Sequence, residues 1–572
     1  MASDLVASWR ADGMPSEMRT ATGLRAAAET LVRRAAAAPE HVGWTMVTIV
    51  SEYWRGRIAA AGAGRRLLLL PDCPCAPAAE VAGTAPVACG PACGIATIWA
   101  AARDGGWVVE STRQAVSGIG SLLTGQYDGI LGIARLADLE KAFAMLPAFS
   151  LPVAALPYEQ VGVTTSCEAG LSAAAIDVDW ALGLLGVGGG EPVPVADYLP
   201  LLREAAHVVT PEGLAALAER VGAEPSFGLG VAADATLADM APLDAAAVLG
   251  GGFTTRGGKF LRPFVALAAF DAVVADLRDS AAAALRTATP PADRAIARDA
   301  AKAAALAIEV FHKASLVHDD IEDADRVRYG RPTLHVECGV PSAINVGDYL
   351  LGVGYRIIAG LPGVGADTVR DVVAILASAH VRLARGQGAE LWWRDAGGRR
   401  LAVAESLAMY GLKTSPAFEA AVAIGIRMAG VAPAAAGAID RYALHVGTGF
   451  QVLNDLKDWA GDVENDRRAA GDLLGGRPTL LWALALERLA PDEVARLRAM
   501  ADEAGRPDAS DATVAACLAE ARRLYDRADV FGRAAAIAAE QRAGAAAAIA
   551  SCRLRRLREV LEFLLDLAVP AQ

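Results

Sequence analysis

A run of acidic side chains at the end of an apolar helix constrains this chain more than any other feature. Residues 312–323 read HKASLVHDDIED, and apolar side chains before and within the run recur at helical spacing. Asp319 and Asp323 then lie one turn apart on one face, at the negative end of the helix dipole, where carboxylates repel one another. Bound cations relieve this repulsion, and oxygen-only ligands favour Mg²⁺, which commonly bridges carboxylates to a diphosphate. The run predicts a cation site, and the alternative is a solvated acidic helix end.

A second oxygen-rich set follows in residues 449–462, which read GFQVLNDLKDWAGD. Asn454, Asp458 and Asp462 recur every four residues, so the pattern predicts one stripe on a single helix that again repels itself without a cation. Two such sets on separate apolar helices, with basic residues such as Arg477 nearby, indicate a cavity with metal and diphosphate at its mouth.

Basic and polar groups accompany both acidic sets. Lys259 and Arg262 lie three residues apart in GGKFLRP, 257–263, just ahead of an apolar helix. Two cations beside glycines that permit close backbone approach suit a diphosphate. The basic loop 326–335 is expected to return toward the first acidic set. Further polar groups within otherwise apolar helices are residues 386–390, Lys413 and Thr414.

The first third of the chain has a different pattern. Four short apolar runs alternate there with helix-compatible segments, which predicts an α/β domain with a mostly parallel sheet. These runs are 67–70, 107–109, 129–133 and 152–156. Glycine and proline in 186–194 disfavour a regular element, and nearly all that follows looks helical. We therefore expect a multidomain chain with an α/β domain at 1–185, a linker at 186–194 and an all-α bundle at 195–572.

Length, charge and cysteine content narrow the class of protein. A chain of 572 residues is too long for one ordinary core. A net charge of −12 argues against nucleic acid as a partner. The chain has no uninterrupted apolar run of about 18 residues, so we expect no transmembrane segment. Eight cysteines without a secretion signal indicate a reducing cytoplasm.

Four cysteines form the one chemical signal in the α/β region. Cys73 and Cys75 follow the first predicted strand, and Cys89 and Cys93 come shortly after. Four thiolates could hold zinc or an iron–sulfur cluster. The alternative is that these cysteines are small core residues with free thiols. The region is similar to uncharacterised cysteine-containing α/β domains of bacteria and archaea.

Five motifs in the helical half, in this order, resemble the all-trans isoprenyl diphosphate synthase family. They are GGKFLRP (257–263), HKASLVHDDIED (312–323), RYGRPTLH (328–335), LKT (412–414) and FQVLNDLKD (450–458). The resemblance covers about residues 196–562 and implies antiparallel helices around a deep apolar cavity. It also implies a homodimer.

The resemblance implies roles for individual residues. Three Mg²⁺ ions on the allylic diphosphate are expected on two acidic sets, Asp319, Asp320 and Asp323, and Asn454, Asp455, Asp458 and Asp462. Contacts to the allylic substrate are expected from Arg328, Lys413 and Gln451, and the isopentenyl diphosphate site from Lys259, Arg262 and His312. Arg477 is a further substrate-binding cation, and the residues expected to act in catalysis are Asp319, Asp320, Asp323, Lys413, Thr414, Gln451 and Asp455.

The implied reaction is ionisation followed by alkylation. Metal and basic side chains stabilise the departing pyrophosphate, and the double bond of isopentenyl diphosphate attacks the allylic cation. Three positions depart from the family pattern. Tyr329 replaces the second arginine of a pair, Asn454 replaces the first aspartate of the second motif, and Arg477 replaces a lysine. A phenol gives one hydrogen bond where guanidinium gives a charged, bidentate one.

The helix before the first acidic set predicts product length. Ala314 and Ser315 are small and lie about one turn below Asp319, whereas Phe311 lies roughly 12 Å below it and could form the floor of the cavity. We expect a product of about C20, or longer if Phe311 points away.

Two other functions stay open. Asn454, Asp458 and Asp462 also resemble the metal-binding triad of class I terpene cyclases, which ionise an allylic diphosphate alone. A non-catalytic scaffold that binds prenyl diphosphates is the other, permitted by Tyr329 and Asn454. Lys259, Arg262 and His312 favour chain elongation, because a cyclase has little use for them.

Overall fold

The structure is a computed structural model. It describes residues 1–12, 14–15, 18, 21–71, 94–112, 121–122, 125–136, 138–139, 151–158, 176–185, 198–221, 241–258, 260–278, 280–288, 291, 293–395, 401–459, 470–477, 479–506 and 508–570. The chain divides into two compact units, Met1–Arg203 with Pro570–Gln572, and Glu204–Val569. The predicted linker at 186–194 lies outside the described residues.

The first unit contains a small parallel sheet in the order β2-β1-β3-β4. Its strands are β1 (Arg66–Leu70), β2 (Val108–Ser111), β3 (Gly129–Arg135) and β4 (Val153–Tyr158). Each strand falls on one of the four predicted apolar runs, since a strand buried within a parallel sheet is apolar on both faces. Its helices are α1 (Ala2–Asp12), α2 (Ala21–Arg34), η2 (Pro39–His41), α3 (Val42–Ala59), α4 (Gly94–Asp104) and α7 (Val178–Leu185).

Helix α3 forms much of the core of this unit. Tyr53 and Trp54 are 1% and 2% exposed and lie in one apolar cluster with Leu68 of β1. The buried Ser51 hydroxyl donates to the carbonyl oxygen of Ala155 at 2.7 Å and accepts from its N–H at 2.9 Å, which ties α3 to β4.

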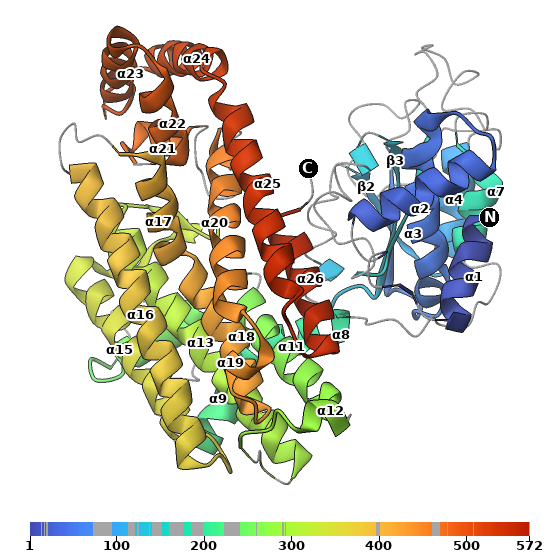
Figure 1. The fold of residues 1–572 in the computed structure, drawn as a ribbon, viewed down its shortest axis with the longest axis horizontal. Helices are drawn as coiled ribbons and strands as arrows, with labels where there is room; N and C mark the ends of the chain where they lie inside the picture. Colours follow the sequence, from blue (N-terminus) through green and yellow to red (C-terminus); the bar gives the residue numbers. More distant parts are fainter. Residues whose placement is uncertain are drawn as a thin grey trace. The chain divides into compact units, whose positions relative to one another are not determined.

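The second unit is helical. Its first elements are α8 (Leu199–Val208, which begins in the first unit), α9 (Pro211–Val221), α10 (Ala245–Thr255), α11 (Leu261–Asp276), α12 (Ser280–Ala283), α13 (Arg294–Glu322), β5 (Val327–Arg328), β6 (Arg331–Pro332), α14 (Leu334–Cys338), α15 (Val340–Ala359) and α16 (Ala366–Asp395). Then follow α17 (Val403–Lys413), α18 (Ser415–Met428), α19 (Pro433–Ala436), α20 (Ile439–Asp458), α21 (Gly471–Leu474), α22 (Leu480–Arg488), α23 (Pro491–Ala504), α24 (Asp511–Arg527), α25 (Val530–Ile549) and α26 (Arg555–Ala568). The long helices of this unit run beside one another, with α13 against α15 and α18 against α20 (Figure 1).

Glycines set the closest helix contacts. A Cβ atom on Gly386 of α16 would lie 2.5 Å from the backbone nitrogen of Lys413, and one on Gly447 of α20 would lie 2.6 Å from Cα of Ser415. These two contacts let the backbones of α16, α17, α18 and α20 approach closely. They bring Lys413 and Thr414, at the junction of α17 and α18, next to polar groups of α16 and α20.

Among the described helices, none combines the length and the apolar character that a membrane span requires.

Candidate active site

The first acidic set lies at the C-terminal end of α13, as predicted. The helix begins at the N-cap Asp293, whose side chain accepts from the Ala295 N–H, and its last turn carries Asp319 and Asp320. Asp320 is 1% exposed, and its Oδ1 accepts from Nε of Arg328 on β5 at 2.6 Å. Burial raises the pKa of the Asp320 carboxyl. Its Oδ2 is buried and has no hydrogen-bond partner among the described residues.

Asp323, the C-cap of α13, binds one arginine on each carboxyl oxygen. Nη1 of Arg394 on α16 lies 3.2 Å from Oδ1, and Nη2 of Arg477 lies 3.1 Å from Oδ2. The other Nη of Arg477 lies 3.1 Å from Asp472 on α21. Arg477 therefore links the first acidic set to the segment after α20.

Asp319 differs from its two neighbours because it has no ion pair within the described part of the chain. Burial raises the pKa of its carboxyl to about 6, a rise that Lys413 opposes and that Asp323 and Glu322 increase. Lys413 reaches this site from the end of α17 and pairs with Glu390 of α16 at 2.8 Å. Asp319 is thus the carboxyl group with the most to gain from a bound cation.

The second acidic set occupies the end of α20, but one prediction about it is wrong. The single helical stripe expected from Asn454 to Asp462 stops at Asp458, where α20 ends. Asp458 Oδ2 accepts from the Asp472 N–H at 3.1 Å, and its carbonyl oxygen accepts from the Ala470 N–H at 2.8 Å. These bonds to a later segment compete with continued helix. Asp462 lies outside the described residues.

Within this set, Asn454 is half-buried and Asp455 points into the protein. Asp455 is 2% exposed, and its Oδ2 accepts from the Tyr410 hydroxyl and, at 3.1 Å, from the Leu480 N–H. Burial raises the pKa of its carboxyl well above the ordinary value. The predicted role of Asp455 as a metal ligand would require these bonds to break. Gln451, one turn earlier, accepts from the Thr414 hydroxyl at 3.3 Å.

A cationic group lies farther up α13. Burial, followed by Arg262, Lys313 and Arg328, holds the pKa of His312 well below its usual value, so the imidazole is neutral among three cations. The predicted pair Arg262 and His312 thus lies together with Arg328, whereas Lys259 lies outside the described residues.

Sequence reasoning missed Lys313. Its side chain is fully buried, and its Nζ donates to the carbonyl oxygens of Arg256 at 2.9 Å and Gly257 at 2.8 Å. A signal was available, because Lys313 follows Val310 by three residues and therefore lies on the apolar stripe of the helix. A charged residue on such a stripe needs partners inside the protein.

Of the predicted chain-length residues, Phe311 faces α15 and α16. The Phe311 ring packs edge-on against Tyr355 of α15, with centroids 4.9 Å apart, and against His380 of α16, with centroids 6.2 Å apart. Ala314 is buried and Ser315 is exposed.

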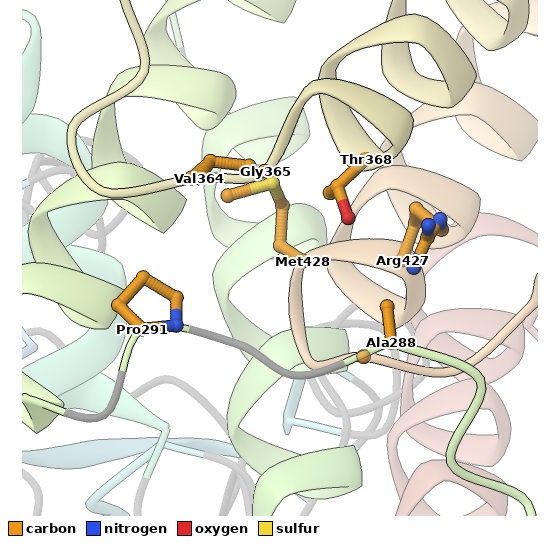
Figure 2. A pocket seen from close by; sticks show the side chains of 8 residues that line it. Ala288, Pro291, Val364, Gly365, Thr368, Arg427 and Met428 are labelled. Atoms are coloured by element: carbon orange, nitrogen blue, oxygen red, sulfur yellow. The ribbon is translucent and has the colours of Figure 1, made fainter.

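A small hollow, with room for about one water molecule, lies elsewhere in the second unit (Figure 2). Arg427, at the end of α18, lines it and is 5% exposed. Thr368 lines it from the first turn of α16, whereas Glu390 of the acidic site lies about 33 Å farther along that helix. The hollow is therefore separate from the acidic site. The four predicted zinc or cluster ligands, Cys73, Cys75, Cys89 and Cys93, lie outside the described residues.

Comparison with known proteins agrees with this geometry. The sequence model of the polyprenyl synthetase family matches residues 251–520. A short chain isoprenyl diphosphate synthase of Methanothermobacter thermautotrophicus is 31% identical over 246 residues, which are 42% of this chain and 67% of that protein. A geranylgeranyl diphosphate synthase of Methanosarcina mazei is 29% identical over 233 residues, which are 41% of this chain and 64% of that protein. The chain thus spans about two thirds of the length of these curated relatives.

A solved structure, the geranylgeranyl pyrophosphate synthetase of Pyrococcus horikoshii, shares the fold. Its TM-score with this chain is 0.50 at 23% identity, and the match covers 66% of this chain and 98% of that one. This likeness concerns the helical fold alone. Through residues 251–520, which contain both acidic sets and the cations around His312, the chain belongs to the polyprenyl synthetase family of prenyltransferases.

Proposed function

We propose that this chain joins isopentenyl diphosphate to an allylic diphosphate in a Mg²⁺-dependent ionisation and condensation, with a product of about C20 or longer. The observation that carries the proposal is the link from Asp323 through Arg477 to Asp472, which ties the end of α13 to the segment after α20. The cations around His312 provide a second place for a diphosphate. The name of the Methanosarcina mazei relative supports a product of about C20.

The acidic residues of α13 have the donor atoms that Mg²⁺ prefers, but among the described residues no three acidic, histidine or cysteine side chains converge as a metal site, so the carboxyl groups would have to move to bind it. Asp320 has a buried oxygen without a partner among the described residues, and Asp319 has no ion pair there. The donors are oxygens only, which Mg²⁺ prefers. Three Mg²⁺ ions would stabilise the charge of the leaving pyrophosphate. The residues that would hold them are Asp319, Asp320, Asp323, Asn454, Asp458 and Asp462, with Asp455 if its inward bonds break. The cysteine-based zinc or iron–sulfur site has no supporting observation.

Protein groups carry the rest of the reaction. Arg328, Lys413 and Gln451 orient the allylic substrate, while Lys413 and Arg477 stabilise negative charge as the carbon–oxygen bond breaks. Arg262 and His312 hold isopentenyl diphosphate, whose double bond attacks the allylic carbon. The carbon–carbon bond forms, and the proton lost from isopentenyl diphosphate passes to the released pyrophosphate. The apolar bundle keeps water from the carbocation.

A direct assay tests the proposal. Purified protein with Mg²⁺ and isopentenyl diphosphate is incubated with dimethylallyl, geranyl or farnesyl diphosphate, and products are identified by mass spectrometry. We expect elongated diphosphates, loss of activity with a chelator, and at least about 100-fold lower kcat in folded Asp319→Ala and Asp458→Ala proteins. Asp299→Ala, on the same helix as Asp319 but about 30 Å away, is the matched control.

The same assay separates the alternatives. A hydrocarbon or alcohol from an allylic substrate alone identifies a terpene cyclase. Binding of both substrates without turnover identifies a prenyl diphosphate scaffold. Either outcome contradicts the proposed condensation, as does an Asp319→Ala protein with unchanged rate.

Product length provides a separate test. Phe311 contacts α15 and α16 below the acidic set, and it is the predicted floor of the cavity. In Phe311→Ala we expect a longer product, because the ring that ends the cavity is removed. An unchanged product distribution by mass spectrometry would remove Phe311 from this role.

The proposal has four further parts. The chain forms a homodimer in the cytoplasm. It has separate domains at 1–185 and 195–572, and the first of them is an α/β domain. Exposed apolar residues on α15 and α16 support the homodimer. They are Val340, Ile344, Tyr355, Val381 and Trp392. We expect light scattering to give twice the mass of one chain, and Val381→Glu to lower that mass.

A further inference from the structure

The ammonium group of Lys313 is buried at the centre of three separate segments. Its side chain is 0% exposed, and two of its three protons bind the carbonyl oxygens of Arg256 and Gly257 at 2.9 and 2.8 Å. These two residues form the turn that leads to Lys259 and Arg262. The ammonium therefore determines where that turn lies relative to α13.

Aromatic rings surround the same ammonium. The ring centroid of Tyr329, in the turn between β5 and β6, lies 4.7 Å from Nζ, and those of Phe260 and Phe253 lie 5.6 and 5.7 Å away. A cation at these distances from a ring face is attracted by the ring quadrupole, and the attraction is stronger where water is excluded. Tyr329 is the nearest of the three rings.

The glycine turn and the hairpin meet at this point. Gly257 has φ +53° and Gly258 has φ +114°, and a side-chain carbon on Gly257 would lie 2.7 Å from Cγ of Tyr329. One on Gly258 would lie 3.5 Å from the Tyr329 oxygen and 3.6 Å from Nζ of Lys313. Glycine is required here both by the backbone conformation and by the space that the Tyr329 ring occupies.

The charges around Lys313 are mostly positive. Burial is the largest cause of the lowered pKa of Lys313; Glu309, one turn earlier on α13, opposes it, and Arg328 of β5 and Arg262 of α11 lower the pKa further. His312 is neutral. Arg328 also pairs with Asp320, so two guanidinium groups and an ammonium face two carboxyl groups, and the one positive charge left over would be neutralised by an anion such as a diphosphate. A third guanidinium, at position 329, would add repulsion beside the ammonium.

We propose that Lys313 is a positioning residue for the diphosphate of isopentenyl diphosphate, and that its charge takes the place of a cation at position 329. Lys313 holds the turn before Arg262, and Tyr329 provides an uncharged ring beside the ammonium. The proposal rests on the proposed condensation for the identity of the ligand. The departure at Tyr329 is then one half of an exchange, whose other half is Lys313.

Binding measured without turnover tests this inference. Isopentenyl diphosphate alone is titrated calorimetrically into the full chain and into Tyr329→Arg, Tyr329→Gln, Lys313→Met and the double variant Lys313→Met/Tyr329→Arg. We expect at least 10-fold weaker binding in Tyr329→Arg and Lys313→Met, less than threefold change in Tyr329→Gln, and a return to within threefold in the double variant. Lys302→Met, the same change at a partly exposed position of α13, is the control and should bind as the parent does.

Steady-state kinetics adds a readout that loss of structure alone would not give. The KM for isopentenyl diphosphate should rise in Tyr329→Arg, while the KM for the allylic substrate stays within twofold. If Lys313→Met does not fold, the inference is decided by comparing the affinities of Tyr329→Arg and Tyr329→Gln for isopentenyl diphosphate, because both variants keep Lys313. Equal binding by these two variants, or a double variant weaker than either single one, overturns the inference.

The outcomes keep the two proposals apart. If the parent condenses the substrates but all variants bind isopentenyl diphosphate equally, the inference fails and the proposed function stands. If the binding pattern is as expected but no condensation occurs, the proposed function fails and the assignment of Lys313 stands.

Discussion

One hydroxyl group, that of Tyr410, connects the second acidic set to two other helices. It donates to Asp455 Oδ2 and accepts from the Leu480 N–H at 2.8 Å, and the Tyr410 side chain is 2% exposed. A buried acceptor that loses its donor is not rehydrated, so the loss of this hydrogen bond is costly. The hydroxyl thus stabilises α17, α20 and the start of α22 together.

In Tyr410→Phe we expect the free energy of unfolding to fall by about 2 kcal/mol, because Asp455 loses a buried donor while the ring stays in place. Urea denaturation checks this value. Tyr355→Phe is the control, since Tyr355 is 37% exposed and its ring contact with Phe311 does not use the hydroxyl. A loss of the same size in both variants would show that the bond to Asp455 is not the cause.

Lys313 should make stability depend on alkaline pH. Burial lowers its pKa from 10.5 to about 8 in the folded protein. Between these values the unfolded chain keeps the proton that the folded protein has lost, so the free energy of unfolding rises with pH in this window. The rise is about 3 kcal/mol when complete.

Urea denaturation of the parent and of Lys313→Met at pH 7, 8, 9 and 10 measures this effect. The difference in free energy of unfolding, parent minus variant, should increase through this range. Contributions from groups common to both proteins cancel in this difference. A difference that stays constant with pH would mean that the Lys313 pKa is not lowered.

Helices α13 and α20 show what could be predicted from sequence and what could not. The acidic end of α13 depends on neighbours within two turns, so periodicity was sufficient to predict it. The partners of Asp323 and Lys313 could not be predicted in this way, because Arg394 is 71 residues from Asp323 and Gly257 is 56 from Lys313. Helix packing decides such pairs. The end of α20 was missed for the same reason, since bonds from Ala470 and Asp472 compete with the helix.

Two aromatic rings of α13 pack against two glycines of α15. A side-chain carbon on Gly354 would lie 2.6 Å from the Phe311 ring, and one on Gly347 would lie 2.3 Å from the His318 ring. Both the glycines and the rings are seven residues apart, which is two helical turns. This repeat sets the register of the two helices and the orientation of Phe311.

Gly354→Ala should therefore destabilise the protein by about 1–3 kcal/mol, because the Phe311 ring must move in a packed interior. Gly352, on the same helix, has nothing within 4 Å of a side-chain carbon. Gly352→Ala should raise stability by about 0.4–1 kcal/mol through the entropy of the unfolded chain. Thermal unfolding of the two variants compares them directly, and effects of the same sign would contradict the assigned contact.

The protein as a whole consists of two compact units, each with its own buried core. The change from short apolar runs to a continuous helical pattern predicts domains at 1–185 and 195–572, whereas the compact units divide between Arg203 and Glu204. Arg203, where the long first segment of the first unit ends, lies within α8, whose second half belongs to the helical unit. Glycine and proline content could not show that a helix continues across the division.

Calorimetry should resolve two unfolding transitions, because each unit buries its own apolar residues. Trp54→Ala removes a side chain of the first unit that is 2% exposed. The free energy of unfolding of that unit should fall by about 3–5 kcal/mol. Tyr410→Phe should lower only the other transition. Prenyl condensation should persist in Trp54→Ala, and equal shifts of both transitions in either variant would contradict independent units.

Asp323 is held by two guanidinium groups, one from α16 and one from Arg477 after α21. A divalent ion on the Asp323 oxygens would free one Nη group of each arginine, while Arg477 stays paired with Asp472 and Arg394 stays bonded to the Glu322 carbonyl oxygen, and the freed groups could bind a diphosphate. A diphosphate that arrives alone must compete with Asp323 for them, and an ion that arrives alone leaves surplus positive charge. At the proposed metal site, metal and substrate would therefore each strengthen the binding of the other, and we expect the apparent affinity for each to increase with the concentration of the other.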